Sequence, residues 1–383
     1  MILQYPYKRF KGVDKMKVLL VGEYSNVHNN LQYGLKQLGV HVDTLNTGDG
    51  YRKFNSDIKL FRINKDERYD KLRKCYSDFL YTYISKKYDV VQFMNELDLG
   101  AIYGLDKALG VRLAKKAKLS VLLMAGCNWQ YFRYAHETLG ISPCKDCLKY
   151  DIKRKYGCTF AHDGLARRTA YYFQKNVDVM VPIAYEYYAC SQYSPFAYKL
   201  SAPICMPMKM GNIDTHTDFN VPKKKLLVYH PLNREGFKGT IMIKKAFHIL
   251  SKRYSDVAEF IIEGKMPYSE FSKLMDKVDI VVDQKNGLSF GMTSLDAMAR
   301  GKILITGNYR KNILAKEYEY VKNAPVFELG TTVEEIVDNI GSVIDRKDEF
   351  EKIAEREKAY VHEYHDCKKV AQQFLDLYEQ KLG

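Results

Sequence analysis

Short apolar runs alternate with longer amphipathic stretches along the chain. The apolar runs of the first half are near-continuous and predict strands at 17–22, 40–46, 88–94, 119–126, 177–183 and 202–208. Such runs are typical of strands in parallel sheets that are covered on both faces. Stretches with helical spacing lie between them, the first at 27–39. The alternation therefore predicts βα units around a parallel sheet.

A second series of the same kind follows a polar stretch at 209–223, where we place the domain junction. Its strands are predicted at 224–231, 258–264, 278–284 and 302–307, and its helices at 239–253, 268–276 and 292–300. The chain ends in an amphipathic helix that gathers four apolar side chains on one side, Val370, Phe374, Leu375 and Tyr378. We expect two doubly wound α/β domains facing each other across a cleft, where ligands bind at the carboxyl ends of the strands.

Length and composition fit this organisation. The 383 residues are too many for one ordinary core. The predicted parts are a basic leader at 1–15, domains at 16–212 and 213–360, and a helix at 361–383 that returns towards the first domain. No run of about 18 apolar residues predicts a transmembrane helix. The leader lacks the apolar core of a signal peptide, so we expect a cytoplasmic protein.

The positive charge is concentrated in the first half of the chain. The net charge is +14, and residues 1–215 hold 33 Lys and Arg against 20 Asp and Glu, whereas the remainder holds 27 against 26. This asymmetry favours an anionic partner such as a membrane surface or a lipid-linked phosphate, although a generally basic proteome would also produce it. We find no nucleic-acid-binding module and expect no nucleic acid partner. The amphipathic stretch at 71–88 indicates either peripheral attachment to the inner face of the membrane or an ordinary solvated helix.

Two loops of the second domain carry candidate binding chemistry. In "YHPLNREGFKGT" (229–240), Arg234 and Lys238 follow a strand and precede a helix, which suits a diphosphate, although basic loops are often merely solvated. In "SFGMTSLDAMARGK" (289–302), glycines precede a helix that has Thr293 or Ser294 near its N-cap. Asp296, one turn in, could accept two hydrogen bonds from a ribose diol or complete a capping box with Thr293. Together the loops indicate a nucleotide-diphosphate site.

The phrase "LSFGMTSLDAMARGKIL" (288–304), with Arg234 and Lys238-Gly239, resembles glycosyltransferases of the GT-B fold, in particular retaining family 4. The resemblance implies two Rossmann-like domains, with Arg234 and Lys238 binding the donor diphosphate. Asp296 stands where the family has a ribose-binding Glu. The family's first Glu, which contacts the transferred sugar, falls on Leu288. The backbone around four further residues would lie against the sugar and phosphates, namely Phe290, Gly291, Met292 and Thr293.

The resemblance also implies contacts from the first domain. The loop after the first strand would face the cleft with Gly22, Ser25, Asn26 and His28, although His28 could equally lie on a helix surface. "MAGCNWQYFRY" (124–134) is similar to a cleft-facing family stretch, with Asn128 where many relatives have Asp. An amide cannot act as a base, but a retaining mechanism of this family implies no need for a base from the protein. Trp129 could stack on an acceptor or simply pack.

The function implied is transfer of a hexose from a nucleoside diphosphate sugar to a glycan or lipid-linked acceptor, as in polysaccharide biosynthesis. Configuration would be retained, and Arg234 and Lys238 would stabilise the leaving group without a divalent ion or other catalytic cofactor. One alternative is a degenerate, non-catalytic relative that binds nucleotide or glycan. Another is a sugar-nucleotide 2-epimerase, for which the sequence offers no recognisable acid–base pair.

Four residues form a candidate metal site outside the glycosyltransferase pattern. Cys144, Cys147, Cys158 and His162 have the spacing C-x2-C-x10-C-x3-H, which can close a tetrahedral zinc site. The alternative is a set of scattered buried thiols. Eight cysteines in a protein expected to be cytoplasmic do not indicate a disulfide scaffold. We therefore predict a structural zinc ion as one of two interpretations.

Overall fold

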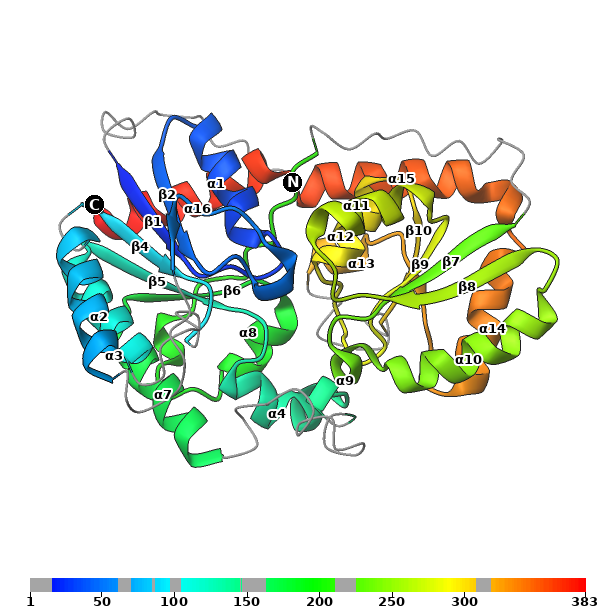
Figure 1. Ribbon diagram of the computed structural model, residues 1–383, viewed down its shortest axis with the longest axis horizontal. Helices are drawn as coiled ribbons and strands as arrows, with labels where there is room; N and C mark the ends of the chain where they lie inside the picture. The colour runs from blue at the N-terminus through cyan, green and yellow to red at the C-terminus, as the bar shows by residue number, and fades with distance from the viewer. Residues whose placement is uncertain are drawn as a thin grey trace.

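The chain folds into two α/β units that lie side by side (Figure 1). The computed structural model describes residues 16–60, 70–84, 87–96, 105–144, 146, 163–210, 225–307 and 318–383. Each unit is built around a fully parallel sheet. The predicted α/β class with two doubly wound domains is confirmed. Every helix within these ranges is too short or too polar to span a lipid bilayer.

The first sheet has the strand order β3-β2-β1-β4-β5-β6. Its strands are β1 (Lys17–Val21), β2 (His41–Asn46), β3 (Ile58–Lys59), β4 (Val90–Phe93), β5 (Leu119–Met124) and β6 (Val179–Pro182). All residues of β4, β5 and β6 are buried, because helices cover both faces. The strand order reverses between β1 and β4, so the loops after these strands open a crevice at their carboxyl ends.

The helices of the first unit are interspersed with its strands along the chain. They are α1 (Val27–Gln37), α2 (Asp70–Ile84), α3 (Leu105–Lys116), α4 (Trp129–Leu139), α7 (Asp163–Asn176) and α8 (Tyr185–Ser191), with short 3-10 turns η2 (Gly50–Arg52) and η5 (Ala197–Lys199). Helix α3 contacts both α2 and α7. These three gather at one end of the unit, away from the second sheet (Figure 1).

The second sheet has the order β11-β10-β9-β7-β8. Its strands are β7 (Leu226–Pro231), β8 (Ala258–Glu263), β9 (Ile280–Val282), β10 (Ile303–Thr306) and β11 (Phe327–Glu328). Its helices are α9 (Glu235–Lys238), α10 (Thr240–Arg253), α11 (Tyr268–Lys277), α12 (Met292–Ala299), α13 (Glu319–Lys322), α14 (Val333–Ile344) and α15 (Phe350–Tyr364). Here the order reverses between β7 and β9, which places the loops that begin at Leu232 and Asp283 at one crevice.

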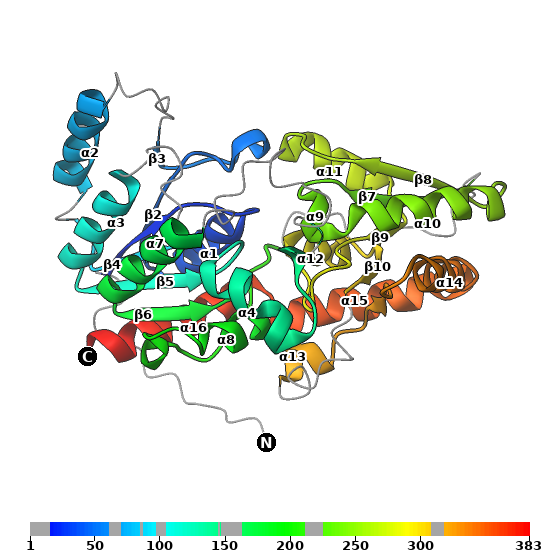
Figure 2. The same ribbon diagram turned by 90° about the horizontal axis from the view of Figure 1, so that it is seen from below.

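The last helix, α16 (Cys367–Leu382), packs on the first unit (Figure 2). Asp366 separates it from α15 and caps it, since its Oδ1 accepts the backbone N–H groups of Lys368 and Lys369. A Cβ at Gly34 of α1 would overlap the carbonyl of Cys367, so glycine permits the close approach of the two helices. Tyr378 donates a hydrogen bond to Gln92 Oε1 of β4 at 2.7 Å. The C-terminal helix thus contributes to the first unit's core.

The strand predicted at 202–208 is wrong. Met208 forms only an isolated bridge with Asp366, and the remaining residues run as an extended strap. Pro203 and Pro207 have no N–H group to donate to a neighbouring strand, which explains why the apolar alternation does not form one. Residues 211–223 of the domain junction predicted at 209–223 lie outside the described residues, so the domain boundaries stay predictions.

Candidate functional site

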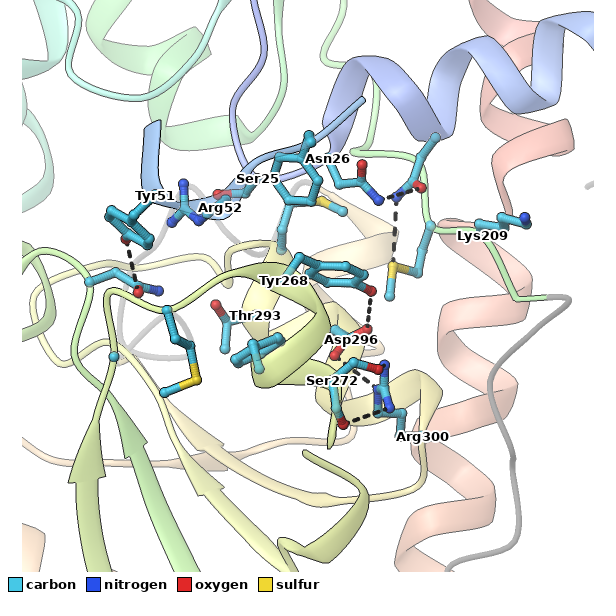
Figure 3. Close-up of a pocket in the computed structure, with 18 residues that line it drawn as sticks. Ser25, Asn26, Tyr51, Arg52, Lys209, Tyr268, Ser272, Thr293, Asp296 and Arg300 are labelled. Atoms are coloured by element: carbon cyan, nitrogen blue, oxygen red, sulfur yellow. Dashed lines mark hydrogen bonds and ion pairs between the residues drawn. The ribbon is translucent and has the colours of Figure 1, made fainter. Parts of the chain in front are cut away.

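A pocket of about 310 Å³ lies between the two units (Figure 3). The first unit contributes polar and aromatic side chains from the loops after β1 and β2, among them Ser25, Asn26, Tyr51, Arg52 and Phe54. The second unit contributes α11, α12 and neighbouring loops, among them Asn233, Met266, Tyr268, Thr293, Asp296 and Arg300. The pocket therefore lies where the two carboxyl edges face each other, as the strand orders require.

Asp296 is the buried acid of this pocket and is 4% exposed. Its Oδ2 accepts a hydrogen bond from Arg300 Nε at 3.0 Å, and its Oδ1 lies 3.5 Å from the Tyr268 hydroxyl. Burial raises the pKa of Asp296, although the charge of Arg300 opposes the rise. Arg300 also binds Asp276 at 2.6 Å, which fixes its guanidinium. Asp296 is thus held at the pocket wall by a cation and can accept further hydrogen bonds.

Helix α12 begins differently from the sequence expectation. Gly291 is its N-cap, and neither Thr293 nor Ser294 caps it through its side chain. Ser294 Oγ instead donates to Asp283 Oδ2 at 2.5 Å, and Thr293 and Met292 line the pocket. The capping-box alternative for Asp296 is therefore wrong, because its carboxylate binds the arginine one turn further along the helix.

Lys238 lies in the interior and is not a solvated loop cation. It ends α9, is 6% exposed, and forms an ion pair with Asp283, the residue that follows β9. Burial lowers the pKa of Lys238, and Asp283 opposes this effect. His230 lies beside the pair, between the Val282 carbonyl and the Thr240 hydroxyl, at 2.7 and 2.8 Å. The crevice between β7 and β9 thus contains a cation that already has a partner.

Arg234 reaches towards the first unit. Its guanidinium lies 4.1 Å from the centre of the Phe237 ring, and Nη1 lies 3.3 Å from Cys127 Sγ. Neither Arg234 nor Lys238 lines the 310 Å³ pocket, although the adjacent Asn233 does. The two predicted phosphate cations are therefore not among the residues that line this pocket.

The loop before α12 contacts the first unit. Leu288 and Ser289 donate their backbone N–H groups to Glu186 of α8, at 3.1 and 3.0 Å. Phe290 is buried against Tyr360 and His365. Phe290 and Gly291 are thus absent from the pocket lining, unlike Met292 and Thr293.

The loop after β1 brings two predicted residues into the pocket. Ser25 and Asn26 line it, and both have left-handed backbones, with φ of 55° and 74°. Gly22, with φ of 86°, does not line the pocket, and its carbonyl is bound by the His28 ring at 2.8 Å. His28 is fully buried, and burial lowers its pKa to about 4. Both expectations for His28 are wrong: α1 begins at Val27, and the imidazole points back into the core.

Asn128 and Trp129 have structural contacts after β5. Asn128 is the N-cap of α4, and its Oδ1 accepts the Tyr131 N–H at 2.7 Å. Trp129 packs in a small apolar cluster with Ala166 and Ala170. Of the two alternatives for Trp129, packing is therefore the one that the structure has. The Asn128 side chain caps helix α4.

Only part of the proposed metal site can be placed. Cys144 lies just beyond α4, whereas Cys147, Cys158 and His162 lie outside the described residues. Within the described ranges, no group of three His, Cys, Asp or Glu side chains is arranged to hold a metal ion. The zinc site stays a prediction.

Several residues that line the pocket were not predicted from the sequence. Tyr51, Arg52 and Phe54 follow two glycines in "TGDGYRKF" (47–54), a turn sequence with cations and aromatic residues directly after a strand. That composition was a usable signal. Tyr268 of the pocket gave no such signal, and neither did Glu186, which holds the loop before α12, because their partners are distant in the sequence.

Comparisons with known proteins agree with the fold described above. Residues 228–376 match the sequence model of the glycosyl transferase-like family. No curated protein matches the chain. Sucrose-phosphate synthase from Thermosynechococcus elongatus superposes with a TM-score of 0.63 at 13% identity, covering 96% of this chain and 99% of that one.

Two further solved structures are similar. Anabaena HepE in complex with UDP-glucose has a TM-score of 0.60 at 13% identity, covering 95% of this chain and 100% of that one. UDP-GlcNAc 2-epimerase from Neisseria meningitidis, bound to UDP-GlcNAc, has a TM-score of 0.53 at 12% identity, with 95% and 100% covered. At these identities the similarity concerns the fold. Residues 228–376 are therefore similar to the glycosyl transferase-like family, and the chain as a whole has the GT-B fold.

Proposed function

We propose that the protein transfers a hexose from a uridine diphosphate sugar to a glycan or lipid-linked acceptor, with retention of configuration and without a divalent ion. The observation that carries this proposal is the interdomain pocket, which joins Asp296 on α12 to aromatic and cationic side chains of both units. Support comes from the match of residues 228–376 to the glycosyl transferase-like family and from HepE, which binds UDP-glucose.

Each part of a sugar nucleotide has a candidate partner around the pocket. The Asp296 carboxylate can accept hydrogen bonds from a ribose diol. Phe54 and Tyr268, with ring centres 5.4 Å apart, offer apolar faces to a base. The N-terminus of α12 at Thr293 favours a phosphate, and Arg234 and Lys238 are the candidate cations for the leaving diphosphate. Acceptors would bind in the first unit, near Ser25 and Asn26.

Nucleotide binding and donor hydrolysis test this function. We expect UDP to bind and one UDP-sugar to release UDP slowly, with equal rates in EDTA and in magnesium. Arg234→Ala should weaken UDP binding and slow hydrolysis, whereas Arg133→Ala, at an exposed position of α4, should change neither. Failure of UDP and of every UDP-sugar to bind would overturn the proposal, and binding without any turnover would favour the degenerate interpretation.

The epimerase alternative gains one observation from the structure. Glu23 and Glu96 follow β1 and β4 and are each 4% exposed. Burial raises the pKa of Glu23 to about 8 and that of Glu96 to about 7. Such groups can exchange protons near neutral pH. Proton NMR of UDP-GlcNAc incubated with the protein distinguishes the two: a 2-epimer supports the epimerase, and free UDP with sugar supports the transferase.

We also propose that the protein works in the cytoplasm, with the first unit at an anionic membrane surface. Helix α2 exposes Leu72, Phe79 and Tyr83, whose exposed fractions are 57%, 65% and 51%. The neighbouring α3 exposes Arg112, Lys115 and Lys116. Apolar side chains beside cations suit the headgroup region of an anionic bilayer.

A further inference from the structure

The loop between β2 and β3 reaches from the first unit to the second across the pocket. Tyr51 donates a hydrogen bond to Asn233 Oδ1 at 3.1 Å, and the Phe54 ring lies 5.4 Å from the Tyr268 ring. Asn233 and Tyr268 both belong to the second unit and line the pocket. Figure 3 labels Tyr268 and Tyr51 there. The loop, residues 47–57, therefore forms one wall of the pocket and bridges the two units.

The loop is held in an unusual backbone conformation. Asp49 and Lys53 have φ of 54° and 55°, in the left-handed region that non-glycine residues rarely adopt, and Gly48 and Gly50 share that region. Such conformations persist only where surrounding contacts determine them, and they cluster at binding sites. Here the contacts come from Asp49, whose Oδ2 accepts the Ser25 N–H at 2.8 Å and pairs with Arg52 Nη1.

Arg52 is a pocket cation that has further hydrogen-bond donors. Its side chain is 21% exposed, lines the pocket and engages Asp49 through Nη1. A guanidinium carries five N–H donors in a planar fork, so an arginine held by a carboxylate on one side can still bind a phosphate. Asp49 would fix the orientation of the Arg52 guanidinium, whose other N–H groups would bind an anion in the pocket.

Cations from both units converge around Tyr51. Burial raises the pKa of Tyr51, and the charges of Arg52, Arg234 and Lys265 each oppose that rise. Burial also lowers the pKa of Lys238, and Arg234 and Arg52 lower it further. Tyr51 and Asn233, which share a hydrogen bond of 3.1 Å, are the chain neighbours of Arg52 and Arg234, so this contact brings the two arginines together. Arg52 of the first unit therefore shares its surroundings with the two cations proposed to meet the donor diphosphate.

We infer that Arg52 binds the donor diphosphate from the first unit, opposite Arg234, and that Asp49 positions it. The inference rests on the proposed function, because it assumes a nucleoside diphosphate in the pocket. A phosphate held between Arg52 and Arg234 would link the two units and favour the closed cleft. Donor binding and domain closure would then depend on one arginine that lies outside the residues similar to the glycosyl transferase-like family.

Calorimetry of the full chain with UDP, UMP and uridine in EDTA tests this inference. We expect Arg52→Ala to weaken UDP binding by about tenfold, as for one lost charge-assisted contact, with less effect on UMP and none on uridine. Arg52→Lys should lose less than Arg52→Ala. Asp49→Asn should have an intermediate effect, because the arginine remains but its direction is no longer fixed.

Two variants serve as controls. Arg133→Ala removes an exposed arginine of the same unit, paired with Glu137 at 2.7 Å, and should leave all three affinities unchanged. Tyr51→Phe removes the loop's hydrogen bond to Asn233 without changing charge, so it should affect UDP and UMP equally. Unchanged melting temperatures would show that the variants fold.

The outcomes separate the two proposals. If UDP binds the wild type and Arg52→Ala binds it equally well, or loses UDP and UMP affinity in the same proportion, the Arg52 inference is wrong and the proposed function stands. If the wild-type chain binds no nucleoside diphosphate, the proposed function is wrong, and so is the inference about Arg52, because it rests on that function.

Discussion

The Glu186 carboxylate of the first unit accepts a hydrogen bond from the Leu288 backbone N–H of the second, at 3.1 Å. The same carboxylate accepts the Ser289 N–H and hydroxyl, at 3.0 and 2.9 Å. Glu186 is 1% exposed, and burial raises its pKa. The family resemblance expects a carboxylate on the side chain of residue 288, which is leucine here. The structure places one beside it from the other domain.

Replacing Glu186 should loosen the contact between the two units. Glu186→Ala leaves three buried donors without their acceptor, and we expect a loss of about 3 kcal/mol in the free energy of unfolding. Glu186→Gln keeps one acceptor oxygen and should cost less. Urea unfolding measures both, with Glu137→Ala as an exposed control. A Glu186→Ala curve that coincides with the control would contradict the structural role.

Glu23 should make stability depend on pH. Its pKa is raised by burial from 4.5 to about 8, so the folded state binds this proton more tightly than the unfolded chain does. The contribution of Glu23 to the free energy of unfolding is therefore complete below about pH 4.5 and is lost as the pH rises towards 8. Glu23→Gln retains an acceptor for the Asn29 N–H, which Glu23 Oε2 accepts at 3.0 Å, and removes the titration.

The measurement is urea unfolding of wild type and Glu23→Gln between pH 5 and pH 8. We expect the free energy of unfolding of Glu23→Gln to increase relative to that of the wild type as the pH rises, by about 1.4 kcal/mol per pH unit at most. Glu137→Gln should give a curve parallel to the wild type. A constant difference between Glu23→Gln and wild type would show that Glu23 does not titrate in this window.

Lys238 and Asp283 should behave as a unit. Lys238→Ala leaves the buried Asp283 carboxylate without its cation, so we expect a loss of about 3–5 kcal/mol in unfolding free energy. Adding Asp283→Asn removes the stranded charge and should recover much of that loss. Only the double variant therefore reports cleanly on UDP binding. If Lys238→Ala alone has the same free energy of unfolding as the wild type, the ion pair does not stabilise the fold.

The sequence predicts the strands well and the partners of charged residues poorly. Continuous apolar runs mark β5 and β7 because both faces of a parallel sheet are buried. The pair Lys238 and Asp283 spans 45 residues, and Glu186 lies 102 residues from Leu288, so no local pattern contains either contact. Asp296 could be assigned from its motif, but its cation Arg300 was not recognised. Local spacing thus indicates part of the pocket lining, namely Ser25, Asn26, Met292, Thr293 and Asp296, whereas long-range contacts formed on folding decide which charged residues are paired.

Asp296 should discriminate between nucleotides by their ribose. If its carboxylate accepts hydrogen bonds from the diol, the wild type will bind UDP more tightly than 2′-deoxy-UDP, by about tenfold for one lost hydrogen bond to a charged group. Asp296→Asn should reduce that ratio towards one while the protein stays folded, since an amide oxygen can still accept from Arg300. Isothermal titration of both nucleotides measures the ratio. Equal ratios in wild type and variant would place the ribose elsewhere.

The exposed face of α2 should bind anionic bilayers. The Phe79 and Tyr83 rings stack with centres 6.3 Å apart, and Lys87 Nζ lies 4.2 Å from the Tyr83 ring centre, so an apolar surface and a cation adjoin. We expect co-sedimentation with vesicles containing phosphatidylglycerol and none with pure phosphatidylcholine. Replacing both Phe79 and Tyr83 by Ser should weaken binding by about tenfold or more, because apolar area no longer enters the interface.

Tyr198 of η5 offers a matched control, since it is 79% exposed on the same unit and lies outside α2 and α3. Tyr198→Ser should leave vesicle binding unchanged. Lys115→Ala with Lys116→Ala should weaken binding mainly at low salt, because exposed charges are screened over about 10 Å at 0.1 M. Binding that survives both the aromatic and the lysine replacements would place the membrane contact on another face, whereas loss with the aromatic pair alone would make α2 an apolar anchor.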